Sequence, residues 1–459
     1  MHKADFAVYV RSFCYFGGEH SPPLIASMLR PFRSLFLLAL TGCAFAMPAI
    51  TSTTPPPPPS DLPTLAAAAE AELLGNILPF WQKHAPATGV FAFQGEVGND
   101  LKPNPQAVRG MLLSARILWT FSAAHRMYPD KGYLAVADAA YKDLEQRFWD
   151  VKQGGYFWAA NPDGSIYNST KQSYGQSFAL YGLAEYHLAS QRPEPLQRAI
   201  QLFHLMEKYA HDARYGGYLE VFTADWKRPA GAKMSVVGPE FPKSQNTHLH
   251  LMEAFSELYR AWPEPLLRTR LREVTELMIT RVPTNDGRHL QLYFDADWSP
   301  RSDHLSFGHD IEANWLLCDA ADALADPEFT KRVHKAALLL AHATLEEGMD
   351  KDGGLWNEAG PKGLTNSGKD WWAQAEAAVG FVNAYQLSND KAQLEAALRV
   401  WDFTEKRIID RKGGEWSIRV EPDGGTNATE PKISMWKCPY HNARACMELV
   451  RRAQPQQSK

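Results

Sequence analysis

The apolar positions along the chain repeat with a helical period from residue 65 to residue 453. In twelve segments, apolar residues recur three and four positions apart, and turns rich in Gly, Pro, Asn and Asp separate these segments. The pattern predicts helices rather than strands, because a half-buried strand alternates apolar and polar residues with a period of two. The predicted helices cover residues 65–84, 106–127, 133–150, 173–190, 195–210, 246–262, 265–282, 308–324, 328–346, 371–388, 391–408 and 439–453.

A glycine turn that leads into a short β-like run recurs along the same region. Its six copies are about 60–70 residues apart and begin at Gly89, Gly154, Gly216, Gly287, Gly353 and Gly413. Six repeats of two helices predict an all-α protein, an (α/α)6 barrel of twelve helices with short β-hairpin-like runs at one end. In each pair, the helix that starts with polar groups should lie inside, and the charged amphipathic helix outside.

The residues before the first predicted helix are typical of an export signal followed by a spacer. We expect residues 1–27 to be a non-native upstream extension, because they have no signal character. Residues 28–46 resemble a secretory signal, in which Arg30 and Arg33 precede an apolar run too short to cross a bilayer. Leu40-Thr41-Gly42-Cys43 resembles the lipobox of bacterial lipoproteins, in which the cysteine is acylated, and Ala44-Phe45-Ala46 is a competing cleavage site. The sequence therefore predicts an exported protein, periplasmic or lipid-anchored through Cys43.

The remaining boundaries follow from composition. Residues 47–63 form a Pro-rich linker with five consecutive prolines, which favour an extended polyproline II spacer. Residues 64–452 form the folded domain, and residues 453–459 form a tail. Apolar residues make up 45% of the 459 residues, enough for a sizeable core. A net charge of −4 without a basic patch argues against a nucleic-acid partner.

Polar side chains gather near the starts of the predicted inner helices. Arg116 is a lone charge in an apolar segment, which indicates either a buried ion pair or a contact with an anionic intermediate. Asn246 and His250 are four residues apart and share a helix face, whereas His248 points elsewhere. His309 and Glu312 form a His-x-x-Glu pattern, and His441 lies near the start of the last helix.

Each histidine has more than one interpretation. A single buried histidine is commonly a hydrogen-bonded core residue, and two histidines with glutamates can bind a metal. A metal site is disfavoured because there is no HExxH motif and because the Glu-x-x-His order of di-iron bundles is reversed. A glycosidase would need paired carboxylic acids, but the recurrent group here is histidine. Three imidazoles at three helix starts favour proton transfer near neutral pH.

Four blocks of sequence carry a resemblance to a known family. Residues 243–263, 308–317, 371–386 and 436–449 resemble, in the right order, the signature blocks of cellobiose 2-epimerases, in the N-acylglucosamine 2-epimerase superfamily. The resemblance spans residues 64–452. It implies an (α/α)6 barrel and an isomerase that epimerises C2 of the reducing-end glucose or mannose of a β-1,4-linked disaccharide, such as cellobiose, lactose or mannobiose. It implies ring opening and an enediolate, with no cofactor and no metal.

The resemblance also implies roles for individual residues. His309 and His441 match the acid/base pair, and His250 and Glu312 match polar positions that support it. Because Glu312 lies one helical turn past His309, we expect it to orient that imidazole. Arg116 matches an arginine near the sugar oxygens. Positions that contact the sugar are matched by Tyr174, Asn246, Trp372 and Trp436.

Other functions stay open at this point. The same enediolate serves a mannose-type aldose–ketose isomerase, and an N-acylglucosamine 2-epimerase would share the fold. A glycoside hydrolase or a non-catalytic glycan-binding lipoprotein is less favoured, because binding alone does not need three histidines.

Overall fold

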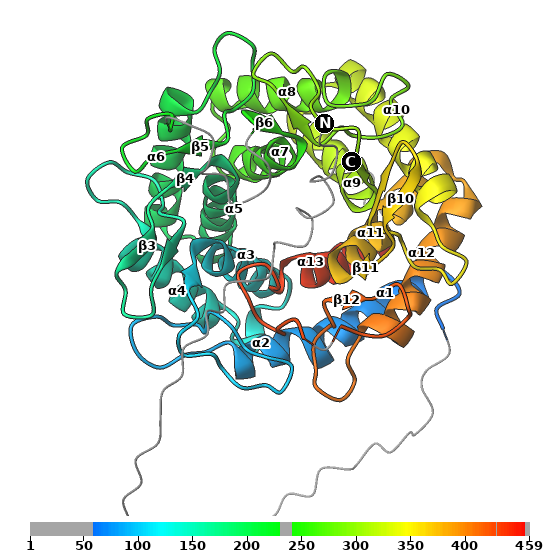
Figure 1. Cartoon of the computed structure of the whole chain (residues 1–459), viewed down its shortest axis with the longest axis horizontal. Coiled ribbons are helices and arrows are strands. Elements are labelled where there is room, and N and C mark those ends of the chain that lie inside the picture. The colour runs from blue at the N-terminus through cyan, green and yellow to red at the C-terminus, as the bar shows by residue number, and fades with distance from the viewer. Residues whose placement is uncertain (1–57, 230–240, 428, 455–459) are drawn as a thin grey trace, which may run out of the picture. The chain divides into compact units, whose positions relative to one another are not determined.

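The computed structural model describes residues 58–229, 241–427 and 429–454, and twelve helical rods fill most of these ranges (Figure 1). The rods form two concentric rings in which inner and outer helices alternate along the chain. The predicted (α/α)6 barrel and its twelve helices are therefore confirmed. Among the described residues, no helix combines the length and the apolarity needed to cross a membrane. The expected signal, Cys43 and most of the linker lie outside the described residues.

The inner ring consists of six helices that are buried on nearly every side. Each packs against its two neighbours in the ring, and the last inner helix closes the circle against the first. Such all-round burial explains why these segments carry small and apolar residues on all faces. The inner helices are α3 (Met111–Met127), α5 (Ser173–Ser190), α7 (Gln245–Ala261), α9 (Phe307–Leu324), α11 (Trp371–Ser388) and α13 (Tyr440–Ala453).

The outer helices are amphipathic and bury one stripe against the inner ring. Four of these rods contain a five-residue π-helical turn, at Leu73–Ile77, Leu144–Phe148, Thr344–Gly348 and Thr404–Ile408. The outer helices are α1 (Leu62–Glu72) continued by α2 (Leu78–His84), α4 (Leu134–Asp143), α6 (Pro193–Tyr209), α8 (Pro265–Thr280), α10 (Pro327–Ala343) and α12 (Lys391–Phe403).

Short strands tie the start of each inner helix to the next repeat. A two-residue strand directly before the helix pairs with a strand that follows the next glycine turn, and the Val97–Ile433 bridge does the same where the circle closes. The β-like runs thus gather at one end of the barrel, as predicted. The pairs are β1 (Arg109–Gly110) with β2 (Ala159–Ala160), β4 (Lys171–Gln172) with β5 (Val221–Phe222), β6 (Lys243–Ser244) with β7 (Tyr293–Phe294), β8 (Leu305–Ser306) with β9 (Glu358–Gly360), and β11 (Lys369–Asp370) with β12 (Arg419–Val420); β3 (Ile166–Asn168) and β10 (Gly363–Asn366) extend two of them.

In each of four glycine turns, an aspartate forms an ion pair with a buried lysine. Lys171 Nζ lies 2.8 Å from Asp150 Oδ2, and Lys243 Nζ lies 2.8 Å from Asp212 Oδ2. The same pairing recurs at Lys369–Asp350 and Lys432–Asp410. Each aspartate begins the turn, and each lysine precedes the next inner helix or the segment leading to it, so the ion pairs fix the ends from which the polar side chains project.

Candidate active site

Equivalent positions of successive inner helices bring the polar residues together. The sixth residues of α3, α5, α7, α9 and α11 are Arg116, Phe178, His250, Glu312 and Glu376. All five are buried, and they contact one another directly or through residues of α13. Because the ring repeats the same helix in the same orientation, one helical position yields a ring of side chains around the barrel axis.

Arg444 of α13 lies at the centre of this cluster. Its Nη2 atom is 2.6 Å from Glu312 Oε1 and 2.7 Å from Glu376 Oε1, and Nη1 pairs with Glu253. Carboxyl groups from three inner helices therefore converge on one guanidinium that is only 1% exposed. Removing Arg444 would leave buried carboxylate charge without compensation.

The pKa values of two of the carboxyl groups shift in opposite directions. Burial alone would raise the pKa of Glu376, but Arg444 and His441 lower it to about 2, so this group is ionised at neutral pH. Burial raises the pKa of Glu312 well above its ordinary value, and the neighbouring charge of Glu376 adds to the shift. Both effects favour the neutral form of Glu312, and its Oε2 is buried without a hydrogen-bond partner among the described residues.

His441 is held by Glu376. Its Nδ1 lies 2.7 Å from Glu376 Oε1, whereas Glu312 Oε1 is 3.9 Å away. A carboxylate at Nδ1 fixes the proton there and leaves a lone pair on Nε2. Burial lowers the pKa of His441 to about 3 despite the favourable charge of Glu376, so the imidazole is neutral and can act as a base.

His309 and His441 both lie beside the Trp372 ring. The ring centroids of His309 and Trp372 are 4.8 Å apart, and those of Trp372 and His441 are 5.6 Å apart. Burial lowers the pKa of His309 to about 3, and its Nδ1 has no partner among the described residues. The expectation that Glu312 orients His309 was wrong. The carboxyl group of Glu312 accepts a hydrogen bond from Arg444, on another inner helix, and makes none with His309.

His250 also belongs to the cluster. Its Nδ1 lies 3.0 Å from Glu253 Oε2, and its ring centroid is 4.6 Å from that of Phe178. Burial lowers the pKa of His250. His248 faces away, as its helix position predicts, and its Nε2 accepts a hydrogen bond from the Tyr218 amide.

Arg116 has no carboxylate within ion-pair distance in the described part of the chain. Its Nη2 donates to the Tyr174 hydroxyl at 2.7 Å, and its Nη1 contacts Cys438 Sγ at 3.6 Å. The guanidinium also lies 4.2 Å from the ring centroid of Phe178. Of the two interpretations of Arg116, the geometry excludes the buried ion pair, and it leaves a buried cation able to meet an anion.

The remaining residues expected to contact a sugar lie at the same end. Asn246 and Trp372 occupy the second position of their helices, as does Tyr174, and the Oδ1 atom of Asn246 has no partner among the described residues. Trp436 lies near Tyr174 and Trp158, with ring centroids 6.3 Å and 6.1 Å away. The structure therefore brings every site residue predicted within the described ranges to one end of the barrel.

The cluster also holds a possible set of metal donors. Donor atoms of Glu312, Glu376 and His441 lie within 4.8 Å of one another. Arg444 already contacts both carboxyl groups and supplies the positive charge that a metal would bring. The donor set thus fits an arginine-centred network better than a cation site.

Sequence reasoning did not assign Glu376, Arg444 or Tyr440 to the site. Glu376 bridges His441, Arg444 and the indole of Trp315, while the Tyr440 hydroxyl lies 2.5 Å from Glu253 Oε1. Aligning the predicted inner helices on their preceding turns would have revealed Glu376, because it occupies the same position as Glu312 and His250.

Comparisons with known proteins agree with this architecture. The sequence profile of the N-acylglucosamine 2-epimerase (GlcNAc 2-epimerase) family matches residues 92–445. The cellobiose 2-epimerase of Bacteroides fragilis is 36% identical over 385 residues, which is 83% of this chain and 97% of the relative. The solved cellobiose 2-epimerase of Bacillus thermoamylovorans B4167 superposes with a TM-score of 0.81 at 34% identity, and the match covers 85% of this chain and all of that one.

A more distant relative has a different activity. The D-mannose isomerase of Marinomonas mediterranea is 23% identical over 384 residues, which is 80% of this chain and 92% of the relative.

Proposed function

This chain belongs to the N-acylglucosamine 2-epimerase family, and we propose that it is a cellobiose 2-epimerase-type isomerase in which His309 and His441 move the proton at C2. Its substrate is a β-1,4-linked disaccharide with glucose or mannose at the reducing end. The observation that carries the proposal is the pair of neutral imidazoles, His309 and His441, that both lie beside the Trp372 ring.

The reaction needs an open sugar. The C2 hydrogen becomes acidic only beside a carbonyl, so the pyranose ring must open to the aldehyde before C2 can lose a proton. Removal of that proton breaks the C2–H bond and places the electron pair in an enediolate across C1 and C2. Arg116, buried without a carboxylate and donating to Tyr174, is placed to stabilise the developing negative charge.

Inversion at C2 then needs two proton carriers. One imidazole takes the C2 proton and becomes an imidazolium. Both imidazoles are neutral in the free protein, so the other one first takes up a proton from solvent. After rotation about the C2–C3 bond it gives that proton to the opposite face of C2, the first imidazolium returns its proton to solvent, and the roles exchange in the reverse direction. The fixed Nδ1 proton of His441 leaves the lone pair on Nε2, so this residue is preorganised as a base.

The supporting groups have separate tasks in this scheme. Glu376 keeps the charge that stabilises a protonated His441, and Arg444 keeps Glu376 ionised. In its neutral form, Glu312 can donate a hydrogen bond from Oε2, which has no partner among the described residues, to a sugar oxygen. Trp372 and Trp436 offer apolar indole surface to the sugar rings.

Incubation of the purified protein with cellobiose in D2O tests the function. We expect deuterium at C2 and a mixture of gluco and manno reducing ends. A ketose product would instead assign the mannose-isomerase reaction, which passes through the same enediolate, and release of glucose would assign a hydrolase.

Variants test the two histidines in the same assay. We expect His309→Ala and His441→Ala each to abolish C2 exchange while the circular dichroism spectrum stays native. His334→Ala, on the outer helix α10, is the matched control and should exchange at the wild-type rate. Wild-type exchange in either active-site variant would remove that histidine from the pair.

We also propose that the mature protein is exported and anchored through an acylated Cys43. The support is in the sequence alone: Arg30 and Arg33 before an apolar run, the Leu40-Thr41-Gly42-Cys43 motif, and the prolines at 55–59 as a spacer. Mass spectrometry of the protein purified from membranes should find a lipid adduct on an N-terminal Cys43. A mature chain that begins at Met47 without an adduct would contradict the anchor.

A further inference from the structure

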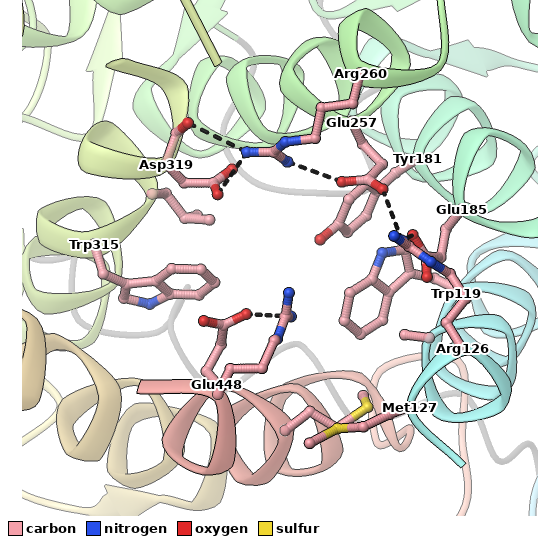
Figure 2. A pocket seen from close by; sticks show the side chains of 14 residues that line it. Trp119, Arg126, Met127, Tyr181, Glu185, Glu257, Arg260, Trp315, Asp319 and Glu448 are labelled. Carbon is pink, nitrogen blue, oxygen red and sulfur yellow. Dashed lines mark hydrogen bonds and ion pairs between the residues drawn. The ribbon is translucent and has the colours of Figure 1, made fainter. Parts of the chain in front are cut away.

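A cavity lies at the end of the barrel opposite the catalytic cluster. Its volume is about 230 Å³, and it is lined by the C-terminal halves of α3, α5, α7, α9 and α13 (Figure 2). None of the residues assigned above to proton transfer lines it. We refer to it as the rear cavity.

The same helical register that builds the catalytic cluster builds the rear cavity. One turn beyond the sixth positions, the ninth residues of α3, α5 and α9 are Trp119, Tyr181 and Trp315. Another turn on, the thirteenth residues of α5, α7 and α9 are carboxylates. The barrel axis therefore carries an aromatic layer between two polar layers, and the outer polar layer is formed by Glu185, Glu257 and Asp319.

The aromatic layer is a thin partition between the two ends. The Trp315 ring lines the rear cavity, while its indole N–H donates to Glu376 Oε2 at 2.9 Å on the catalytic side. Trp119 stacks on Tyr181 with centroids 5.0 Å apart. Figure 2 shows Trp119 and Trp315 on opposite sides of the cavity.

Polar atoms in this partition have no partner. Tyr181 is 6% exposed, and its hydroxyl makes no hydrogen bond with any described residue, although Figure 2 shows it turned toward the space between the two indoles. The indole N–H of Trp119 also has no hydrogen-bond partner in the described ranges, but it has almost no accessible surface and so cannot meet a ligand. The Tyr181 hydroxyl is therefore the group that a ligand or an ordered water in the cavity can reach.

The charged groups around the rear cavity pair with one another. Arg126 lies 2.7 Å from Glu185, Arg260 lies 3.0 Å from Glu257 and 2.7 Å from Asp319, and Arg451 pairs with Glu448. Burial raises the pKa of Glu185 well above its ordinary value, and Glu257 beside it adds to the shift. Because each of the three guanidinium groups already has a carboxyl partner in the lining, an ionic ligand would have to displace an existing ion pair.

We propose that the rear cavity binds a neutral hexose. Indole surface can cover the C–H groups of a pyranose, while the Tyr181 hydroxyl and the rim of carboxylates and guanidinium groups can hydrogen-bond its hydroxyls. The cavity is smaller than the usual range of roughly 300–1,000 Å³ for sites that hold drug-sized ligands, so it fits one sugar ring rather than a disaccharide.

Calorimetric titration of D-glucose into the full-length protein tests the proposal. Cellobiitol at saturating concentration, a reduced disaccharide without a carbonyl, occupies the catalytic end. We expect a remaining site with a stoichiometry of one and a dissociation constant on the order of 1 mM, as suits a ligand of about twelve non-hydrogen atoms.

Variants of residues that line the rear cavity test glucose binding there whether or not cellobiitol occupies the catalytic end. Tyr181→Phe should weaken glucose binding about tenfold, because it removes one hydrogen bond. Ala123→Phe should abolish binding by filling the cavity, since Ala123 lines it. Tyr186→Phe is the matched control, because its hydroxyl contacts Asp138 outside the cavity. Thermal unfolding checks that each variant is folded.

Three outcomes would overturn the proposal. They are the absence of glucose binding in the presence of cellobiitol, an unchanged affinity in a folded Ala123→Phe variant, and binding of inorganic phosphate or tetramethylammonium in place of glucose. Loss of the D2O exchange described above would bear on the catalytic end only, so the two proposals fail separately.

Discussion

Nδ1 of His441 lies 2.7 Å from Oε1 of Glu376, and the same oxygen accepts a hydrogen bond from Arg444. The other oxygen of Glu376 accepts the indole N–H of Trp315. All three partners are donors, so Glu376 must be an acceptor at both oxygens. A glutamine cannot replace it, because its NH2 group would face a donor in either orientation.

We therefore expect Glu376→Gln to lower kcat by about a hundredfold or more, since His441 loses its fixed tautomer and its counter-charge. KM should change little, because Glu376 does not face the sugar. The exchange rate at C2 measures the effect. Glu346→Gln, at the surface, is the control. A Glu376→Gln variant with wild-type kcat would contradict the assigned role.

Arg116 should act on the transition state rather than on substrate binding. Its guanidinium has no carboxylate partner in the described ranges and rests on Phe178 and Tyr174. We expect Arg116→Gln to lower kcat by about 10²–10³-fold, as for the loss of one preorganised donor to a developing oxyanion, with KM within about threefold of wild type. Arg332→Gln, which breaks a surface pair with Glu276, is the control. A raised KM with normal kcat would instead mean that Arg116 binds the ground state.

The fold could be predicted from the sequence because the patterns that indicate it lie within short segments of the chain. The helical period and the glycine turns each recur within one repeat, and repetition fixes the ring. The sequence also indicated that His309 and His441 start two inner helices. What it did not reveal was contact across the barrel, such as Arg444 of α13 meeting Glu253 of α7, because those residues are 191 positions apart.

The error about Glu312 has the same origin. Residues three apart on a helix are neighbours, and this predicted a contact between Glu312 and His309. The Glu312 side chain is near the neutral imidazole of His309 on its own helix and the buried guanidinium of Arg444 on another helix. It bonds to Arg444, because a charged donor forms the stronger hydrogen bond. The spacing rule considers only residues on one helix, so it cannot predict a contact with Arg444, which only the closed ring of helices brings close to Glu312.

Close helix packing in the inner ring gives a test of the fold that does not involve the site. A Cβ at Gly380 of α11 would lie 2.5 Å from the backbone oxygen of Ile311 on α9. We expect Gly380→Ala to lower the free energy of unfolding by about 1–3 kcal/mol, because the two helices must move apart. Urea denaturation followed by circular dichroism measures it.

The matched control for Gly380→Ala is Gly75→Ala on an outer helix. No atom lies within 4 Å of a Cβ at Gly75, which is exposed. There we expect a gain of roughly 0.5–1 kcal/mol, because alanine loses less backbone entropy in a helix. A destabilised Gly75→Ala or a neutral Gly380→Ala would contradict the described packing.

His248 is the fourth residue of α7. Its side chain forms a hydrogen bond with the backbone of the preceding glycine turn. Its Nε2 accepts the Tyr218 amide at 2.9 Å, and its Nδ1 lies 2.7 Å from the carbonyl oxygen of Ser244. The equivalent residues of α5 and α11 are Gln176 and Gln374, whose amides bond the equivalent turn backbone. Glutamine is thus a natural, non-titrating substitute for His248.

Burial lowers the pKa of His248 to about 4, from 6.5 in the unfolded chain. Between these values the unfolded state binds one more proton than the native state, so His248 contributes stability that is present above pH 6.5 and is lost as the pH falls toward 4. We expect His248→Gln to reduce the slope of unfolding free energy against pH by about 1.4 kcal/mol per pH unit near pH 5. Urea denaturation of both proteins at several pH values between 7 and 4.5 measures the slopes. Equal slopes would mean that His248 is protonated in the native state and that the Tyr218 amide has another acceptor.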